Sequence, residues 1–134
     1  MKKVYMKEKW SGNMENNRKE QLEALKVLGD FQDKIIGNAG LLMNELKICR
    51  KPDTDKLLKS VTDAVNWEMS ILSNTLDLIN EKEEVLNKTG INESVMAFAG
   101  ALQSQDDAKI AEALEQHLLP ALQKIEDAIR AVRE

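Results

Sequence analysis

A chain of 134 residues has room for one domain of ordinary size with a modest hydrophobic core. Two prolines, six glycines and an aromatic content of 4% describe a composition that forms helices more readily than strands. The net charge is −4, and basic residues are concentrated in the first 19 positions, so the rest of the chain is acidic. An acidic body repels phosphate backbones, which argues against nucleic-acid binding.

The N-terminal segment predicts a basic leader ahead of the folded domain. Residues 1–17 show no sustained helical periodicity, so we expect a flexible leader over 1–17 and a single helical-bundle domain over 18–134. The leader lacks the apolar run of a secretory signal, and no stretch is apolar enough to span a bilayer. We therefore expect a cytoplasmic protein without a membrane partner. Translation from Met14 is an open alternative to Met1, because the codons just upstream can form a bacterial ribosome-binding sequence.

A long amphipathic helix is predicted from Leu22 to Cys49. Apolar or small residues recur there at alternating intervals of three and four, except at Gln32; they are Leu25, Leu28, Ile35, Ala39, Leu42, Leu46 and Cys49. The weak helix formers from Gly37 to Gly40 leave a break as the alternative, but the same heptad phase on both sides favours one continuous helix. Cys49 is expected to be a small buried hydrophobe of this stripe.

The strongest regularity is an apolar doublet that recurs every seven residues in a second predicted helix. The doublets are Leu57-Leu58, Ala64-Val65, Ile71-Leu72, Leu78-Ile79 and Val85-Leu86. This stripe is wider than a contact between two helices requires, so we expect the second helix to touch two neighbours and to lie at the centre of the bundle. Thr89-Gly90 is expected to end it.

Two further helices complete the predicted fold. A short one follows Asn92, its expected N-cap, and a longer one follows the acidic turn at Asp106-Asp107. Pro120 lies inside the apolar pattern of the last helix, so a kink or a brief break is expected just before it. The predicted fold class is therefore all-α: an antiparallel up-down four-helix bundle with two long helices and a last helix kinked near Pro120.

Trp67 is the main candidate for a partner contact. It lies opposite the main stripe of its helix by phase, with Ile71 and Leu78 on its flank, so these three residues form the predicted contact surface. The alternative is that Trp67 packs against another helix of the bundle or against a second copy of the chain. The homodimer prediction rests on the doublet stripe and on four further apolar residues, which together exceed what one small bundle buries; they are Met43, Ile48, Trp67 and Leu78.

We predict no catalytic residue, no cofactor and no metal site. One histidine and one cysteine are too few ligands for the usual zinc or di-iron sites, and the serines have no partner in a recognisable catalytic motif. A lone His117 in a helical bundle is similar in architecture to histidine phosphotransfer domains. The residues after it, Leu118-Leu119-Pro120-Ala121, depart from the Gly and Lys pattern of that family.

Several short motifs between Asp53 and Ile125 form a combined pattern. They are Asn66-Trp67, Ala101-Leu102, Asp106-Asp107, Ile110-Ala111-Glu112, Leu114-Glu115 and Leu119-Pro120 with Leu122. This combination, over about half of the chain, resembles a family of small uncharacterised bacterial helical-bundle proteins. The resemblance implies a helical bundle and assigns no activity.

By elimination, the sequence favours a non-enzymatic protein-protein interaction module. We expect an adaptor, or a chaperone for export or assembly, that holds an amphipathic helix of another protein in a groove. The alternatives are a histidine phosphotransfer-like signalling domain using His117 and a structural subunit of a larger complex. A contiguous exposed apolar strip favours the adaptor, whereas a closed cavity lined by buried carboxylates or His117 favours ligand chemistry.

Overall fold

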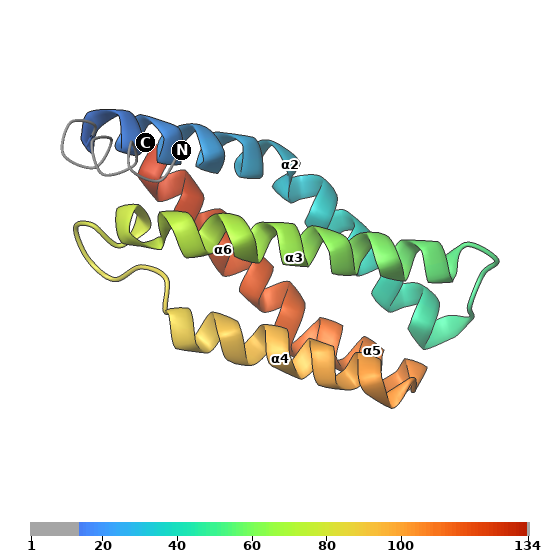
Figure 1. Ribbon diagram of the computed structural model, residues 1–134. Helices are drawn as coiled ribbons and strands as arrows, with labels where there is room; N and C mark the ends of the chain where they lie inside the picture. Colours follow the sequence, from blue (N-terminus) through green and yellow to red (C-terminus); the bar gives the residue numbers. More distant parts are fainter. Residues whose placement is uncertain (1–13, 134) are drawn as a thin grey trace, which may run out of the picture.

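The folded chain is an all-α bundle, as the composition and periodicity predict (Figure 1). This computed structural model describes residues 14–133, and within that range every regular element is a helix. The elements in chain order are α2 (Met14–Ile48), α3 (Thr54–Ile79), α4 (Lys88–Ser104), α5 (Asp107–Ala113), the π-helical turn η1 (Leu114–Leu118) and α6 (Leu119–Arg133). Because α5, η1 and α6 follow one another without a loop, they form one C-terminal helix, and the described residues form four helices.

The first helix is longer than predicted and has no break. α2 begins at Met14, so the predicted start of the folded domain at residue 18 falls inside a helix, while residues 1–13 of the predicted leader lie outside the described residues. The chain passes through Gly37 and Gly40 in helical conformation, which confirms the prediction of continuity. A Cβ atom at either glycine would meet no atom within 4 Å, so close packing is not the reason for these glycines.

The core side of α2 follows the predicted stripe up to its last member. The buried residues of this stripe are Leu25, Leu28, Gln32, Ile35, Ala39, Leu42 and Leu46. Cys49 is exposed, so the prediction that it is buried is wrong. The physical reason is that α2 ends at Ile48, so Cys49 has left the helical phase that would have directed its side chain inward.

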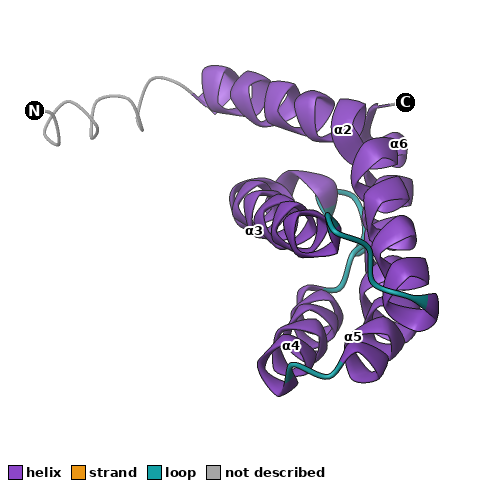
Figure 2. Ribbon diagram, turned by 90° about the vertical axis from the view of Figure 1, so that its right-hand side faces the viewer, coloured by secondary structure: helices purple, strands orange, loops and turns teal. Residues whose placement is uncertain are grey.

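α2, and not α3, is the central helix. Hydrogen bonds join Gln21 Nε2 to Asn74 O at 2.8 Å and Thr54 Oγ1 to Glu45 Oε1 at 2.7 Å, so α2 and α3 run antiparallel. α3 contacts α2 and α6, whereas α2 contacts α3, α5, η1 and α6. The C-terminal helix crosses the molecule and ends beside the N-terminal half of α2 (Figures 1 and 2). Because the C-terminal helix crosses α2 in this way, α2 contacts more helices than its single predicted apolar stripe indicates.

α3 ends at Ile79, about ten residues before the end predicted at Thr89-Gly90, so that prediction is wrong. The physical reason is that the side chain of Asn80 stabilises a loop instead of a further helical turn. Asn80 Oδ1 accepts hydrogen bonds from the backbone N–H groups of Val85 and Leu86, each at 3.0 Å, and Asn80 Nδ2 donates to Leu86 O. These bonds satisfy the loop backbone outside a helix. Asn87 then caps α4 by accepting from Gly90 N at 2.7 Å, so the predicted cap at Asn92 is wrong.

The expected irregularity before Pro120 takes the form of a π-helical turn. Leu119 N–H donates to Leu114 O, five residues earlier, which is the hydrogen-bond pattern of a π-helix. Pro120 has no N–H of its own, so the widened turn accommodates the proline without ending the helix. α4 packs against α5 and this turn.

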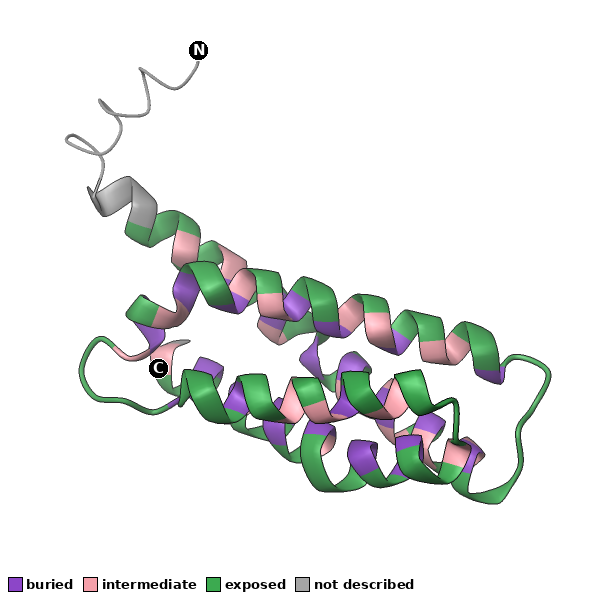
Figure 3. Ribbon diagram, turned by 60° about the horizontal axis from the view of Figure 1, so that its bottom comes forward, coloured by how far each residue is buried: buried purple, intermediate pink, exposed green. Residues whose placement is uncertain are grey.

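Apolar side chains lie between the helices, and charged side chains lie on the outer surface of the bundle. Figure 3 shows each helix exposed on its outer side and buried where it faces its neighbours. Across the described residues, no helix combines the length and the apolarity that crossing a bilayer requires.

Two adjacent leucines test the register of α2. Leu42 is fully buried, whereas 48% of Leu41 is exposed. We expect Leu42→Ala to lower the free energy of unfolding by about 2–5 kcal/mol, because it leaves a cavity in the core. The matched control Leu41→Ala should change it by less than about 0.5 kcal/mol. Urea unfolding followed by circular dichroism measures both, and equal losses would contradict this register.

Candidate functional site

An apolar groove runs between α2 and α3 on the surface of the bundle. Its volume is about 360 Å³, and its lining residues are Phe31, Lys34, Ile35, Asn38, Ser60, Val61, Ala64 and Trp67. Ile35 and Val61 are buried and form its floor, whereas Lys34, Asn38 and Ser60 supply polar groups. A groove with an apolar floor and a few polar groups suits a bound apolar segment.

Phe31 and Trp67 form an exposed aromatic pair across this groove. Their ring centroids are 5.9 Å apart with an interplanar angle of 90°, which is the favourable edge-to-face arrangement. The exposed fractions are 49% for Phe31 and 38% for Trp67. Trp67 therefore packs on a second helix and still leaves part of its ring accessible.

The three predicted contact residues are not equally accessible. Ile71 is half-buried near Trp67, but only 7% of Leu78 is exposed. Leu78 belongs to the same core cluster as Leu86, which follows α3, so it cannot form part of a contact surface. The prediction that Leu78 contacts a partner is wrong, whereas contact through Trp67 and Ile71 stays a prediction.

α2 carries a second heptad stripe that the sequence analysis missed. Its positions alternate by four and three; they are Val27, Phe31, Lys34, Asn38, Leu41, Glu45 and Ile48, called here the outer stripe. The four apolar members are all exposed, although apolar residues at such spacing are usually buried. The signal was present in the sequence, but the stronger core stripe beside it concealed it.

A buried polar layer lies directly beneath the aromatic pair. Gln32 and Glu68 follow Phe31 and Trp67 in the chain, and only 1% and 0% of them are exposed. Gln32 Nε2 donates to Glu68 Oε2 at 3.1 Å and to the backbone O of Leu122 at 3.0 Å, so this polar layer joins α2, α3 and α6. Burial raises the pKa of Glu68 to about 7, and the hydrogen bond from Gln32 partly opposes that shift.

The sequence contained a signal for this layer as well. Gln32 is the one exception in the predicted α2 stripe, and it occupies a core position. Glu68 lies on the buried stripe of α3 formed by Val61, Val65, Glu68, Leu72, Thr75 and Ile79, whose intervals alternate by four and three. The apolar doublets supplied Val65, Leu72 and Ile79 of this stripe, but the polar residues between them were passed over, so Glu68 was missed.

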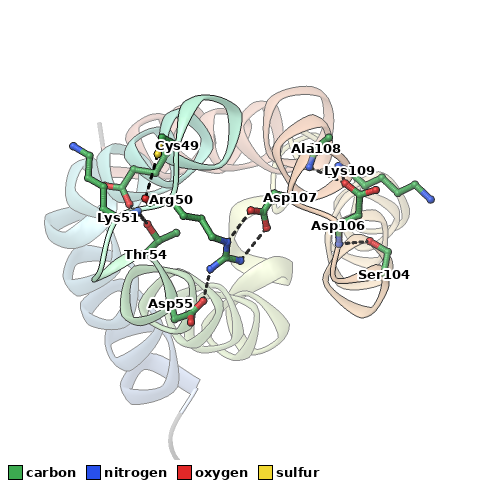
Figure 4. Close-up of polar contacts among 11 residues, drawn as sticks. Cys49, Arg50, Lys51, Thr54, Asp55, Ser104, Asp106, Asp107, Ala108 and Lys109 are labelled. Carbon is green, nitrogen blue, oxygen red and sulfur yellow. Dashed lines mark hydrogen bonds and ion pairs between the residues drawn. The ribbon is translucent and has the colours of Figure 1, made fainter.

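The other polar features are on the surface. His117 is exposed on η1 and is not one of the residues that line the groove. Arg50, in the loop that follows α2, bonds both α3 and α5 (Figure 4): its Nε and Nη2 donate to Asp107 at 2.7 and 2.9 Å, and its Nη1 donates to Asp55 at 2.5 Å. The hydrogen bonds from Arg50 hold the pKa of Asp107 below its usual range. Among residues 14–133, no three potential metal ligands gather into a site.

The chain belongs to the family DUF8042, a domain of unknown function, whose sequence pattern matches residues 19–128. This match agrees with the expectation of an uncharacterised family, and it extends well beyond the segment 53–125 that carried the resemblance. No curated protein matches the chain, and no solved structure matches it. The groove and the polar layer therefore carry the functional argument.

Glu68 makes stability fall as the pH rises. Its pKa is raised from 4.5 to about 7 by folding, so the folded state holds this proton more tightly than the unfolded state. The resulting stability is fully present below pH 4.5 and is lost as the pH rises through about 7. Glu68→Gln is neutral at every pH and removes this dependence. Relative to the variant, we expect the wild type to lose about 2 kcal/mol between pH 5.5 and 8.

Urea unfolding of both proteins over this pH range measures the difference. The comparison cancels the opposite contributions of surface carboxylates such as Glu81 and Asp107, whose pKa values are lowered by their arginine partners. Parallel pH profiles for the two proteins would contradict the assignment.

Proposed function

We propose that the protein is a non-enzymatic interaction module that binds an amphipathic helix of another protein along the groove between α2 and α3. The observation that carries this proposal is the exposed aromatic pair Phe31 and Trp67 beside an apolar floor. Aromatic residues that are fixed by packing and still accessible are typical anchors of protein interfaces. In a cell this role fits a cytoplasmic adaptor of bacterial type, or a chaperone for export or assembly.

The outer stripe supports a helix as the occupant. Its alternating intervals of four and three match the periodicity with which one helix packs along another. A helix lying on Val27, Phe31 and Leu41 could contact Trp67 of α3 at the same time, which is the geometry of helix-in-groove recognition. The acidic balance of the chain after its basic first 19 residues favours a partner helix with basic flanks.

Replacing Trp67 should remove the partner. We expect affinity purification from a lysate of the source organism to retain a stoichiometric partner on the wild-type chain, and Trp67→Ala to weaken its binding about 30-fold, the effect of losing an interface anchor worth about 2 kcal/mol. Met96→Ala is the matched control, because Met96 is an exposed apolar residue of α4, outside the groove lining. Equal retention by the Trp67→Ala variant would contradict the proposal.

A second copy of the chain is the competing occupant of the groove. The exposed apolar members of the outer stripe support this homodimer, which was also predicted from the sequence. Light scattering during size-exclusion chromatography at high micromolar concentration separates the two proposals. A monomer would end the homodimer proposal, whereas a dimer that Phe31→Ala converts to a monomer would replace the foreign helix by a second copy.

A further inference from the structure

We propose that the Glu68 carboxyl is protonated in the folded bundle and donates a hydrogen bond to Gln32 Oε1. The packing of α3 against α2 and α6 then depends on pH. This inference concerns the polar layer and does not rest on the proposed function.

The polar layer contains fewer hydrogen-bond donors than acceptors when Glu68 is ionised. Both hydrogens of the Gln32 amide are committed, one to Glu68 Oε2 and one to Leu122 O. Gln32 Oε1 and Glu68 Oε1 are buried and have no hydrogen-bond partner. Both atoms are acceptors when Glu68 is ionised, so the charged layer leaves two buried acceptors unpaired, which is costly.

A single proton resolves this shortage. Protonation of Glu68 Oε1 converts one of the two unpaired acceptors into a donor, and the remaining acceptor, Gln32 Oε1, belongs to the amide that already bonds Glu68 Oε2. In the proposed state, the carboxylic acid and the amide form two hydrogen bonds side by side. Every side-chain N and O atom of Gln32 and Glu68 then has a hydrogen-bond partner, and the layer carries no charge. Both properties favour the burial of Glu68, which is 0% exposed.

No other titratable group near the layer can take the place of this proton. The residues three and four positions away from Gln32, Glu68 and Leu122 share a helix face with them, and all are apolar or glycine except Glu126 of α6; they are Leu28, Gly29, Ile35, Ile36, Ala64, Val65, Ile71, Leu72, Leu118, Leu119 and Ile125. Glu126 Oε2 accepts from Arg130 at 2.8 Å. The titratable neighbours that follow Gln32 on α2, Asp33 and Lys34, are exposed.

We expect ionisation of Glu68 to weaken the packing of α3 more than the packing of the other helices. α2 contacts α5, η1 and α6 independently of α3, so these helices keep their shared core when α3 moves away. α3 is joined to α4 by the loop from Asn80 to Asn87, which gives it room to separate. Ionisation of Glu68 therefore favours opening of α3, and it loosens the groove because Trp67 lies next to Glu68 on the same helix.

The first test is a titration of the full-length chain with ¹³C-labelled glutamate carboxyl groups, followed by NMR and assigned with Glu68→Gln. We expect the Glu68 carboxyl to titrate with a midpoint near 7. A midpoint near the ordinary value of 4.5 would overturn the proposal, because the carboxyl would then be charged in the folded bundle at neutral pH. This readout needs only the wild type to be folded.

The second test is hydrogen exchange at α3 amides, corrected for the intrinsic dependence of exchange on pH. We expect the opening equilibrium constant of α3 to rise about 25-fold between pH 5.5 and 8 in the wild type and to stay nearly constant in Glu68→Gln. The amides of α4 serve as the internal control. A pH-independent opening of α3, or an equal rise in both proteins, would overturn the proposal. Neither test involves a partner, so failure here is distinct from failure of the proposed function.

Discussion

The rest of the structure depends on α2 presenting two parallel heptad stripes to two different environments. One stripe supplies the core, where Leu25, Leu28 and Leu42 are completely buried. The other stripe, displaced by one residue at Phe31 and Leu41, remains exposed along the groove with α3. A helix with two adjacent apolar stripes covers a wide arc, and α3, α5 and α6 cover only part of it.

The aromatic pair on the exposed part of this arc and the buried polar layer lie at the same position along α2 and α3. Phe31 and Trp67 meet at the surface, and the next residue on each helix, Gln32 and Glu68, meets its counterpart inside. The bond from Gln32 to Leu122 extends this level to α6. Because the same two helical segments form both features, the proposed ionisation of Glu68 would also alter the groove.

Much of the fold was predictable from the spacing of apolar residues. The all-α class, the unbroken α2 and the irregularity before Pro120 follow from periodicity and from the chemistry of proline. The end of α3 did not follow, because the Asn80 side chain bonds the loop backbone at Val85 and Leu86 in competition with one more helical turn. Such competition depends on tertiary contacts that a heptad pattern does not contain.

The candidate site was predictable only in part. Trp67 was identified by its phase, but Phe31 was not, because the stronger core stripe beside it on α2 concealed the outer stripe. Gln32 and Glu68 are polar residues at core positions, and a search for apolar residues passes over them. Leu78 was misassigned because the doublet pattern does not show that both of its members, Leu78 and Ile79, are buried in the bundle.

The most direct measurement for the central claim, that the groove between α2 and α3 receives a helix of another protein, is photo-crosslinking in cells of the source organism. A photoreactive phenylalanine analogue replaces Phe31 in one variant and Met96 in another, since both positions are exposed and only the first lines the groove. The account predicts a covalent adduct from position 31, with the cross-link located in an amphipathic helix of the partner, and no such adduct from position 96. The same adducts from both positions, or none from position 31, would contradict it.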